Sequence, residues 1–412
     1  MKLALHVCVL ALIACVTTQA AEATKKKNPR EKAARATTSE VVDSTQAQFA
    51  AESKLIEIYQ LIAQARTREA LAKAQALARA QPNFQLAQLV YGDLLSSQLK
   101  PLRTLGDVPE PTAKAYAEQL SSLREESQLR LKALRERPPA GMIPSQFLSL
   151  SAQSRYAIAV DTSRARLYLF KNTRQGLELL TDYYISVGKY GIGKTLEGDQ
   201  RTPLGVYYTM GEIDPKSLTD FYGAGALPLN YPNAWDVQSG RTGNGIWLHG
   251  TPSNQYARPP RATNGCVVLT NPDLQGLMTK LQARPTPVVI AKQLQWVPAQ
   301  SLQAQRSQFE AVLRSWRLAR ATGDLATLQS HYVSAALANK SLDRGASNSH
   351  SRSTATPSEV KNFNLLRWQE GTDIIVATYN ESTPGQKLVR LKQQYWSQQH
   401  GTWKIFYEGF LK

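Results

Sequence analysis

The sequence has 412 residues, more than one ordinary domain of about 150 residues, so two or three domains are expected. Hydrophobic residues make up 42% of the chain, which excludes a protein that is disordered throughout. The formal net charge of +17 suits contact with an anionic partner.

Residues 1–21 have the pattern of a secretory signal peptide. Lys2 precedes the apolar run Leu3–Val16, which is shorter than a membrane span of about 20 residues. Thr18-Gln19-Ala20 resembles the small-residue pattern of a cleavage site, with cleavage expected after Ala20 or Ala21. Lipidation of Cys15 is the less favoured alternative. Export predicts a periplasmic protein, so acidic wall polymer or anionic lipid headgroups are better anionic partners than nucleic acid.

The next part of the chain is expected to be a linker followed by helices. Residues 22–45 are rich in Ala, Thr and Lys, which is typical of a flexible linker. Apolar residues at helical spacing predict helices over 46–98 and 112–137. The helical region is therefore expected to span residues 46–140 and to end near Pro138.

The helical region resembles one and a half tetratricopeptide repeats, with small residues at Ala70 and Ala74 and a proline at Pro82. A stable array usually needs about three repeats. We therefore expect an arm that packs against the rest of the chain or joins two copies as a homodimer, rather than a peptide-binding superhelix.

A central β-rich domain is expected over residues 150–294, because the apolar period changes to two near Tyr156. The expected strands cover residues 156–160, 167–170, 183–187, 202–208, 245–250, 265–269 and 288–291.

The last part, residues 301–412, is expected to be a compact α+β module. A helix over 301–320 and a short helix from Leu325 precede a serine-rich loop over 345–357. The expected strands cover residues 365–370, 373–380, 388–397 and 402–407. The whole chain is thus predicted to be a multidomain α+β protein.

Cysteine usage singles out one residue. Signal cleavage removes Cys8 and Cys15 and leaves Cys266 unpaired in a compartment where cysteines usually form disulfides. Such a cysteine forms an intermolecular disulfide, is an inert buried thiol, or is reactive.

The surroundings of Cys266 favour reactivity. A thiol needs a neighbouring base to form its thiolate near neutral pH, and His249 ends a predicted strand nearby. Gly265 lets the chain bend so that its own amide and that of Cys266 point at one developing oxyanion. Arg258 and Arg261, in the loop between the two motifs, suit binding of a carboxylate.

No metal or other cofactor is expected. His249 and Cys266 are two ligands at most, whereas a zinc site needs about four, or three and a water. His331, His350 and His400 belong to the C-terminal module.

Residues 154–292 resemble the L,D-transpeptidase catalytic domain of bacterial cell-wall enzymes. The resemblance rests on His249-Gly250, on Thr263-Asn264-Gly265-Cys266-Val267, and on two upstream elements, Gly188-Lys189 and Thr202-Pro203-x-Gly205-x-Tyr207. It implies that Cys266 attacks a peptidoglycan stem peptide between diaminopimelate and D-alanine and forms a thioester. His249 then acts as the base and Gly265 contributes to the oxyanion site. The substrate contacts that we expect are Thr263, Asn264, Arg261, Arg258, Tyr207 and Trp247.

Two positions depart from the family pattern. Many members carry an arginine where this chain has Val268, and a histidine or other polar residue in place of Asn264. A subgroup that includes cell-shape L,D-carboxypeptidases has a similar helical N-terminal region and a C-terminal module resembling nuclear transport factor 2. Transfer to an amine and hydrolysis by water therefore both stay open. A non-catalytic wall-binding scaffold is the rival class, and it leaves Cys266 and His249 unexplained.

Overall fold

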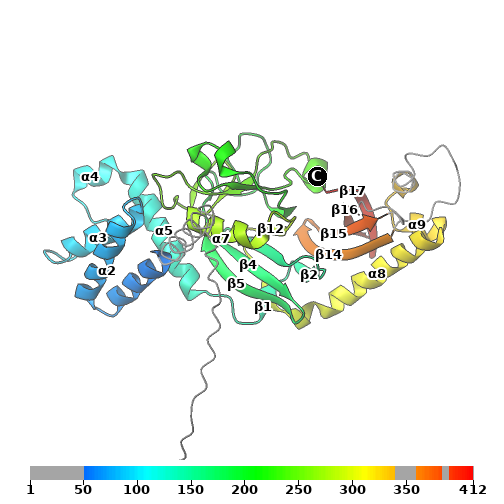
Figure 1. The fold of residues 1–412 in the computed structure, drawn as a ribbon, viewed down its shortest axis with the longest axis horizontal. Helices are drawn as coiled ribbons and strands as arrows, with labels where there is room; N and C mark the ends of the chain where they lie inside the picture. Colours follow the sequence, from blue (N-terminus) through cyan, green and yellow to red (C-terminus); the bar gives the residue numbers. More distant parts are fainter. Residues whose placement is uncertain (1–50, 339–358, 383–388, 412) are drawn as a thin grey trace, which may run out of the picture. The chain divides into compact units, whose positions relative to one another are not determined.

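The computed structural model describes residues 51–338, 359–382 and 389–411, and these all belong to one compact unit. It confirms the predicted fold class: a helical N-terminal region, a central β-rich domain and a C-terminal sheet module (Figure 1). The predicted signal peptide, the linker over 22–45, Cys15 and the loop over 345–357 lie outside the described residues.

The N-terminal region consists of the predicted helices. They are residues 51–63, α2 (Thr67–Ala80), α3 (Gln85–Ser96), α4 (Glu110–Ala115) and α5 (Ala117–Arg135). Ala70 and Ala74 are buried in α2, where small side chains let neighbouring helices approach closely. Tyr256, from the central domain, packs into the same apolar cluster as the helices. The helical region therefore shares part of its core with the central domain.

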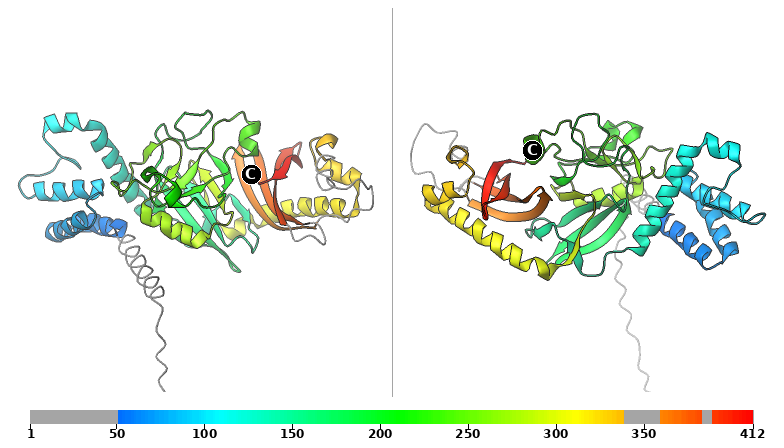
Figure 2. Two further views of the ribbon diagram at one scale, coloured as in Figure 1. Left: turned by 45° about the horizontal axis from the view of Figure 1, so that its top comes forward. Right: turned by 180° about the vertical axis from the view of Figure 1, so that it is seen from behind.

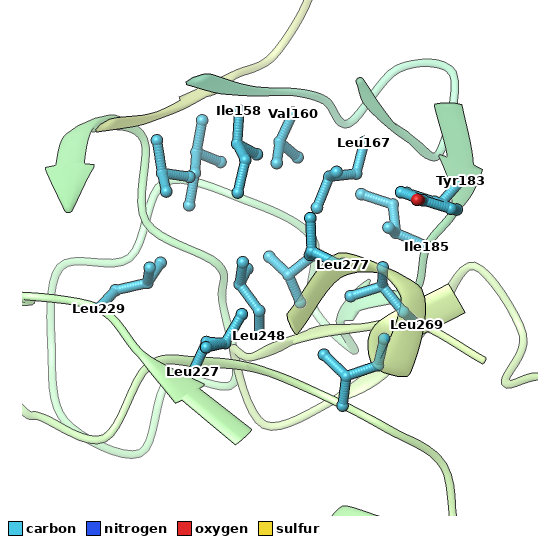
Figure 3. Close-up of a cluster of buried hydrophobic side chains, with 14 of the residues drawn as sticks. Ile158, Val160, Leu167, Tyr183, Ile185, Leu227, Leu229, Leu248, Leu269 and Leu277 are labelled. Carbon is cyan, nitrogen blue, oxygen red and sulfur yellow. The ribbon is translucent and has the colours of Figure 1, made fainter. Parts of the chain in front are cut away.

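The central domain is built on a five-stranded sheet with the order β5-β4-β3-β12-β7. Its strands are β3 (Tyr156–Asp161), β4 (Arg166–Thr173), β5 (Gly176–Tyr184), β7 (Gly205–Tyr208) and β12 (Pro287–Ala291). β3 and β12 run parallel, and the other pairs are antiparallel. Alternate residues such as Ile158, Val160 and Leu167 face the main core, which Figure 3 shows.

Shorter strands lie across this core. β8 (Ala226–Pro228), β9 (Trp247–His249) and β11 (Val267–Val268) form a second sheet, and β6 (Val187–Gly188) pairs with β10 (Arg261–Thr263). Short helices η1 (Pro215–Ser217), η2 (Asp220–Tyr222) and α6 (Ala234–Gln238) occupy the connections. α7 (Asn271–Leu281) is a helix that the sequence analysis did not predict, and its Leu274, Leu277 and Leu281 close the core.

The C-terminal module packs a long helix against an antiparallel sheet (Figure 2). Its elements are η3 (Ala299–Leu302), α8 (Gln303–Thr322), α9 (Leu325–Ser330), β14 (Glu359–Glu370), β15 (Thr372–Ser382), β16 (Val389–Gln399) and β17 (Thr402–Phe410). Phe309, Leu313 and Trp316 form the buried face of α8. Among the described residues, no helix is long and apolar enough to cross a membrane.

The segment before the central domain contributes to the C-terminal sheet. β2 (Phe147–Ser149) pairs with β14 as the edge strand, and β1 (Met142–Pro144) pairs with β13 (Trp296–Pro298). Strands from both sides of the central domain thus join, which ties the C-terminal module to it at two places.

Substitution of Leu248 measures how much the burial of β9 in the core stabilises the protein. It is fully buried between His249 and Trp247, so Leu248→Ala is expected to lower the free energy of unfolding by about 2–5 kcal/mol. Leu180→Ala, at an exposed leucine of β5, is the matched control and is expected to cost less than about 1 kcal/mol. Urea denaturation measures both, and equal losses would contradict this assignment of the core.

Candidate active site

The pairing of β9 with β11 brings the two predicted catalytic residues together. The strands are parallel, with Val267 opposite Leu248 and Val268 opposite His249. If the register is continued by one residue before Val267 and Leu248, Cys266 lies opposite Trp247. Because side chains two residues apart on a strand share a face, Cys266 and His249 project from the same face of the sheet.

Backbone groups of the neighbouring strand hold the half-buried thiol of Cys266. The Trp247 amide donates to Sγ at 3.4 Å, and Sγ lies 3.4 Å from the Gly245 carbonyl, to which the thiol donates. Burial raises the pKa of Cys266, and the Trp247 amide and the nearby charges of Arg258 and Lys194 oppose that rise. The thiol is therefore protonated in the free protein at neutral pH.

His249 is almost fully buried, and one of its ring nitrogens is already paired. Nδ1 lies 2.7 Å from the Gly250 carbonyl, which can only accept, so Nδ1 carries the proton. Nε2 consequently keeps a lone pair. Burial, aided by the charge of Arg258, lowers the pKa of His249 to about 4, although the bond to Gly250 acts in the opposite direction. The imidazole is neutral at pH 7, as a general base must be.

Aromatic side chains surround the imidazole. The Tyr222 ring meets that of His249 edge-on with centroids 5.1 Å apart, and the Phe221 ring lies at 5.8 Å. Tyr222 also contacts Trp247 at 4.9 Å. These rings exclude water from His249 and account for the burial that lowers its pKa.

Gly265 has a conformational role that corrects one expectation. Its φ of 121° favours glycine, and a Cβ there would lie 2.7 Å from the Arg201 carbonyl. The Gly265 amide does not belong to the oxyanion site, because it donates to Thr263 Oγ1 at 3.0 Å. The hydroxyl of Thr263 in turn donates to the Cys266 carbonyl at 2.7 Å. The Cys266 amide is left as the proposed donor to the oxyanion.

Two predicted substrate contacts are instead structural. Thr263 is buried, and its hydroxyl closes the turn before Cys266. Tyr207 is fully buried in the core, and its hydroxyl donates to Leu204 and Asp236. Neither side chain can reach a substrate.

The structure distinguishes the two arginines of the loop. Arg258 is 8% exposed, and its guanidinium lies over the Phe221 ring at 4.4 Å, where its charge opposes the burial that raises the pKa of Cys266. Its Nε has no hydrogen-bond partner among the described residues. Arg261 is exposed and pairs with Glu125 at 2.9 Å. Arg258 is therefore the better candidate to bind a substrate carboxylate next to the thiol.

The remaining predicted contacts lie at the thiol. Asn264 is exposed two residues before Cys266. Trp247 touches the thiol through its amide, while its ring packs on Tyr222. Both positions stay proposed substrate contacts. Among the described residues, no three His, Cys, Asp or Glu side chains gather as a metal ion would require.

Sequence reasoning missed several residues of the site. Lys194 is 4% exposed and paired with Asp199, and its charge acts on the thiol. Asn271 Oδ1 accepts the Thr251 amide, which fixes the chain after His249. These contacts join segments that are far apart in the sequence, so no local sequence pattern predicts them. The run Asp220–Tyr222 gave the only local signal, because adjacent aromatic residues in a loop often line a site.

Residues 155–290 match the model of the YkuD family, the L,D-transpeptidase catalytic domain. The central domain is an L,D-transpeptidase catalytic domain. Enzymes of this family act on peptidoglycan stem peptides. No protein of curated function matches the chain significantly.

Two solved structures resemble the chain over more than the L,D-transpeptidase domain. Bd1075 of Bdellovibrio bacteriovorus is 23% identical with a TM-score of 0.51, over 66% of this chain and 98% of that one. The helical cell shape determining protein Pgp2 of Campylobacter jejuni is 19% identical with a TM-score of 0.46, over 70% of this chain and 100% of that one. At this identity, the similarity to Bd1075 shows a shared fold.

The C-terminal module contacts the L,D-transpeptidase domain at Trp235 and Arg241, on the chain that leads to Gly245. Glu370, at the end of β14, pairs with Arg241 and accepts from the Trp235 indole at 3.1 Å. Arg241 also binds the buried Asp236 at 2.9 Å. The chain continues from Arg241 to Gly245, whose carbonyl contacts the thiol. The C-terminal module thus supports one of the two loops that meet at Cys266.

The protonation states of the pair can be tested by alkylation. Since both groups are neutral at pH 7, the rate of Cys266 alkylation by iodoacetamide is expected to be low there and to rise with pH. Its midpoint is expected above the ordinary cysteine pKa of about 8.5. In His249→Asn the midpoint is expected to stay within about half a unit, because a neutral imidazole contributes no charge. A plateau already present below pH 7 would reveal a preformed thiolate–imidazolium pair and contradict this assignment.

Proposed function

We propose that this protein is an exported cysteine enzyme that forms a thioester with a peptidoglycan stem peptide at the bond between diaminopimelate and D-alanine. One observation carries the proposal: the β9–β11 register sets the only cysteine of the described residues on one face with a neutral histidine. The match of residues 155–290 to the L,D-transpeptidase catalytic domain supports the substrate class.

In the proposed first half-reaction, Cys266 Sγ attacks the peptide carbonyl while its proton passes to His249 Nε2. The pKa of the buried thiol exceeds that of the imidazole, so the proton moves as the S–C bond forms rather than before it. The imidazolium then protonates the leaving D-alanine amine, and the C–N bond breaks. A thioester and neutral His249 remain.

Positive charge near the sulfur favours this step. The Cys266 amide is proposed to stabilise the oxyanion, and Arg258 and Lys194 offset negative charge at the sulfur. Arg258 is proposed to hold a stem-peptide carboxylate, because its positive charge acts at the thiol and its guanidinium lies over Phe221, the neighbour of His249.

In the second half-reaction an acceptor attacks the thioester and restores the thiol. Transfer to the amine of another stem peptide, the family's transpeptidation, is the leading proposal. Hydrolysis to a tripeptide, as by an L,D-carboxypeptidase, is the second candidate. It is favoured by Val268, which shares the face of Cys266 and places a buried apolar group where many family members have a cation.

Export to the periplasm follows from the proposed signal peptide and from a cell-wall substrate. The homodimer through the N-terminal helices and the lipid anchor at Cys15 stay predictions. A wall-binding scaffold is the weaker proposal, because it gives no role to a cysteine and a histidine on one buried face.

The proposed reaction predicts defined products. The mature protein, incubated with purified disaccharide-tetrapeptide, is expected to release D-alanine, and mass spectrometry separates a cross-linked dimer (transpeptidase) from a free tripeptide (carboxypeptidase). Cys266→Ala is expected to abolish both products, and His249→Asn to slow them about 100-fold or more. Unchanged substrate, beside an active homologue as control, would refute the enzyme proposal.

The two arginines provide a matched pair for substrate binding. Arg258→Gln is expected to raise KM for a tetrapeptide about tenfold or more, because a charged hydrogen bond in a buried site is lost. Arg261→Gln, at the exposed partner of Glu125, is expected to change KM by less than about threefold. Steady-state kinetics measure KM for the two variants. A larger increase in Arg261→Gln than in Arg258→Gln would assign the carboxylate site to Arg261 instead.

A further inference from the structure

Arg258 lies in the segment that joins the two catalytic motifs, residues 251–261, here called the arginine loop. The N-terminal helical region holds its outer side. The Asn83 side chain donates to the Ser253 carbonyl at 3.1 Å, and the Tyr256 amide donates to the Asn83 carbonyl at 3.1 Å. The Phe84 and Tyr256 rings pack with centroids 4.5 Å apart. A turn between α2 and α3 therefore clamps the arginine loop.

A second line of contacts reaches the backbone of Arg258 itself. The Tyr184 hydroxyl, on β5, donates to the Arg258 carbonyl at 3.0 Å. The Arg130 guanidinium of α5 stacks on the Tyr184 ring at 3.7 Å. Arg130 is 1% exposed and is itself fixed by Glu52 at 2.6 Å and Glu126 at 2.8 Å. Helical residues thus determine where Tyr184 lies, and Tyr184 determines where the Arg258 backbone lies.

These contacts matter because a cation acts on the thiol only from a defined position. The interaction of Arg258 with Cys266 falls with distance, and a loop free to move would spread the guanidinium over many positions. The ring of Phe221 under the guanidinium completes the support. The contacts of the helical region therefore converge on the loop that carries Arg258.

We propose that the N-terminal helical region is part of the acyl-donor site, and that Tyr184 is a positioning residue that sets Arg258 against Cys266. Asn83 and Phe84 fix the outer side of the same loop. The proposal rests on the proposed function only in that Arg258 meets a substrate carboxylate; the placement of its charge beside the thiol is independent of any substrate.

Two alkylating reagents of similar size test that placement without peptidoglycan. Anionic iodoacetate is attracted by a fixed cation, and neutral iodoacetamide is not, so the ratio of their rates at Cys266 reports the position of Arg258. In the full mature protein, Arg258→Gln is expected to lower the iodoacetate-to-iodoacetamide ratio about fivefold. Tyr184→Phe, which removes only the hydroxyl, and Asn83→Ala are each expected to lower it about two- to threefold.

Tyr59→Phe is the matched control. It removes a hydroxyl that bonds to Ser127 at 2.8 Å inside the helical region and that, among the described residues, makes no hydrogen bond to the arginine loop, so the ratio is expected to stay unchanged. Thermal melting confirms that each variant is folded. If Tyr184→Phe does not fold, Asn83→Ala carries the test alone.

The outcomes separate this proposal from the proposed function. A ratio that falls in Arg258→Gln but not in Tyr184→Phe or Asn83→Ala overturns the positioning role. An unchanged ratio in Arg258→Gln overturns it as well, because the cation then does not act at the thiol. A lowered ratio in Tyr184→Phe together with inactivity on muropeptides upholds the positioning and refutes only the peptidoglycan reaction. With an active enzyme, Tyr184→Phe is expected to raise KM more than it lowers kcat.

Discussion

The parallel pairing of β9 with β11 is the constraint on which the site depends. Each strand has two or three residues, too few to hold a register alone. The register persists because Leu248 and Val267 are buried in the main core, while Ser186 pairs with Val268 on the other side of β11. A slip by one residue would turn the thiol into the core. The core over the five-stranded sheet therefore helps to hold the register that sets Cys266 and His249 on one face.

Burial determines the protonation states of Cys266 and His249 in the free protein. Aromatic rings and the core exclude water from His249, and a poorly hydrated site disfavours both the imidazolium and the thiolate. A protonated thiol is less open to oxidation than a thiolate. The charges of Arg258 and Lys194 act on the thiol, but they do not outweigh the effect of its burial.

The flanking modules each support a different loop of the central domain. The helical region grips the arginine loop through Asn83 and Tyr256, and the C-terminal module holds Arg241 through Glu370. From Arg241 the chain leads to the carbonyl of Gly245 at the thiol. The helical region thus contacts the loop that carries Arg258, and the C-terminal module contacts the segment that leads to the sulfur of Cys266. This division explains why the central domain is joined to both by buried and charged contacts.

The sequence by itself predicted the N-terminal helices, α8, the strands with long apolar alternation and the family of the central domain, since these follow from local periodicity and from short motifs. It also singled out Cys266 and His249 as a candidate pair, but it did not predict α7. It did not determine that the Gly265 amide and the Thr263 hydroxyl are used within their own turn, or that Tyr207 is core. Nor did it separate Arg258 from Arg261, which have similar local sequence but opposite burial. Those properties depend on how the folded chain surrounds each side chain. Tyr207 lies in the main core, and Arg258 lies over Phe221 within the central domain. Arg261 instead reaches Glu125 of the helical region.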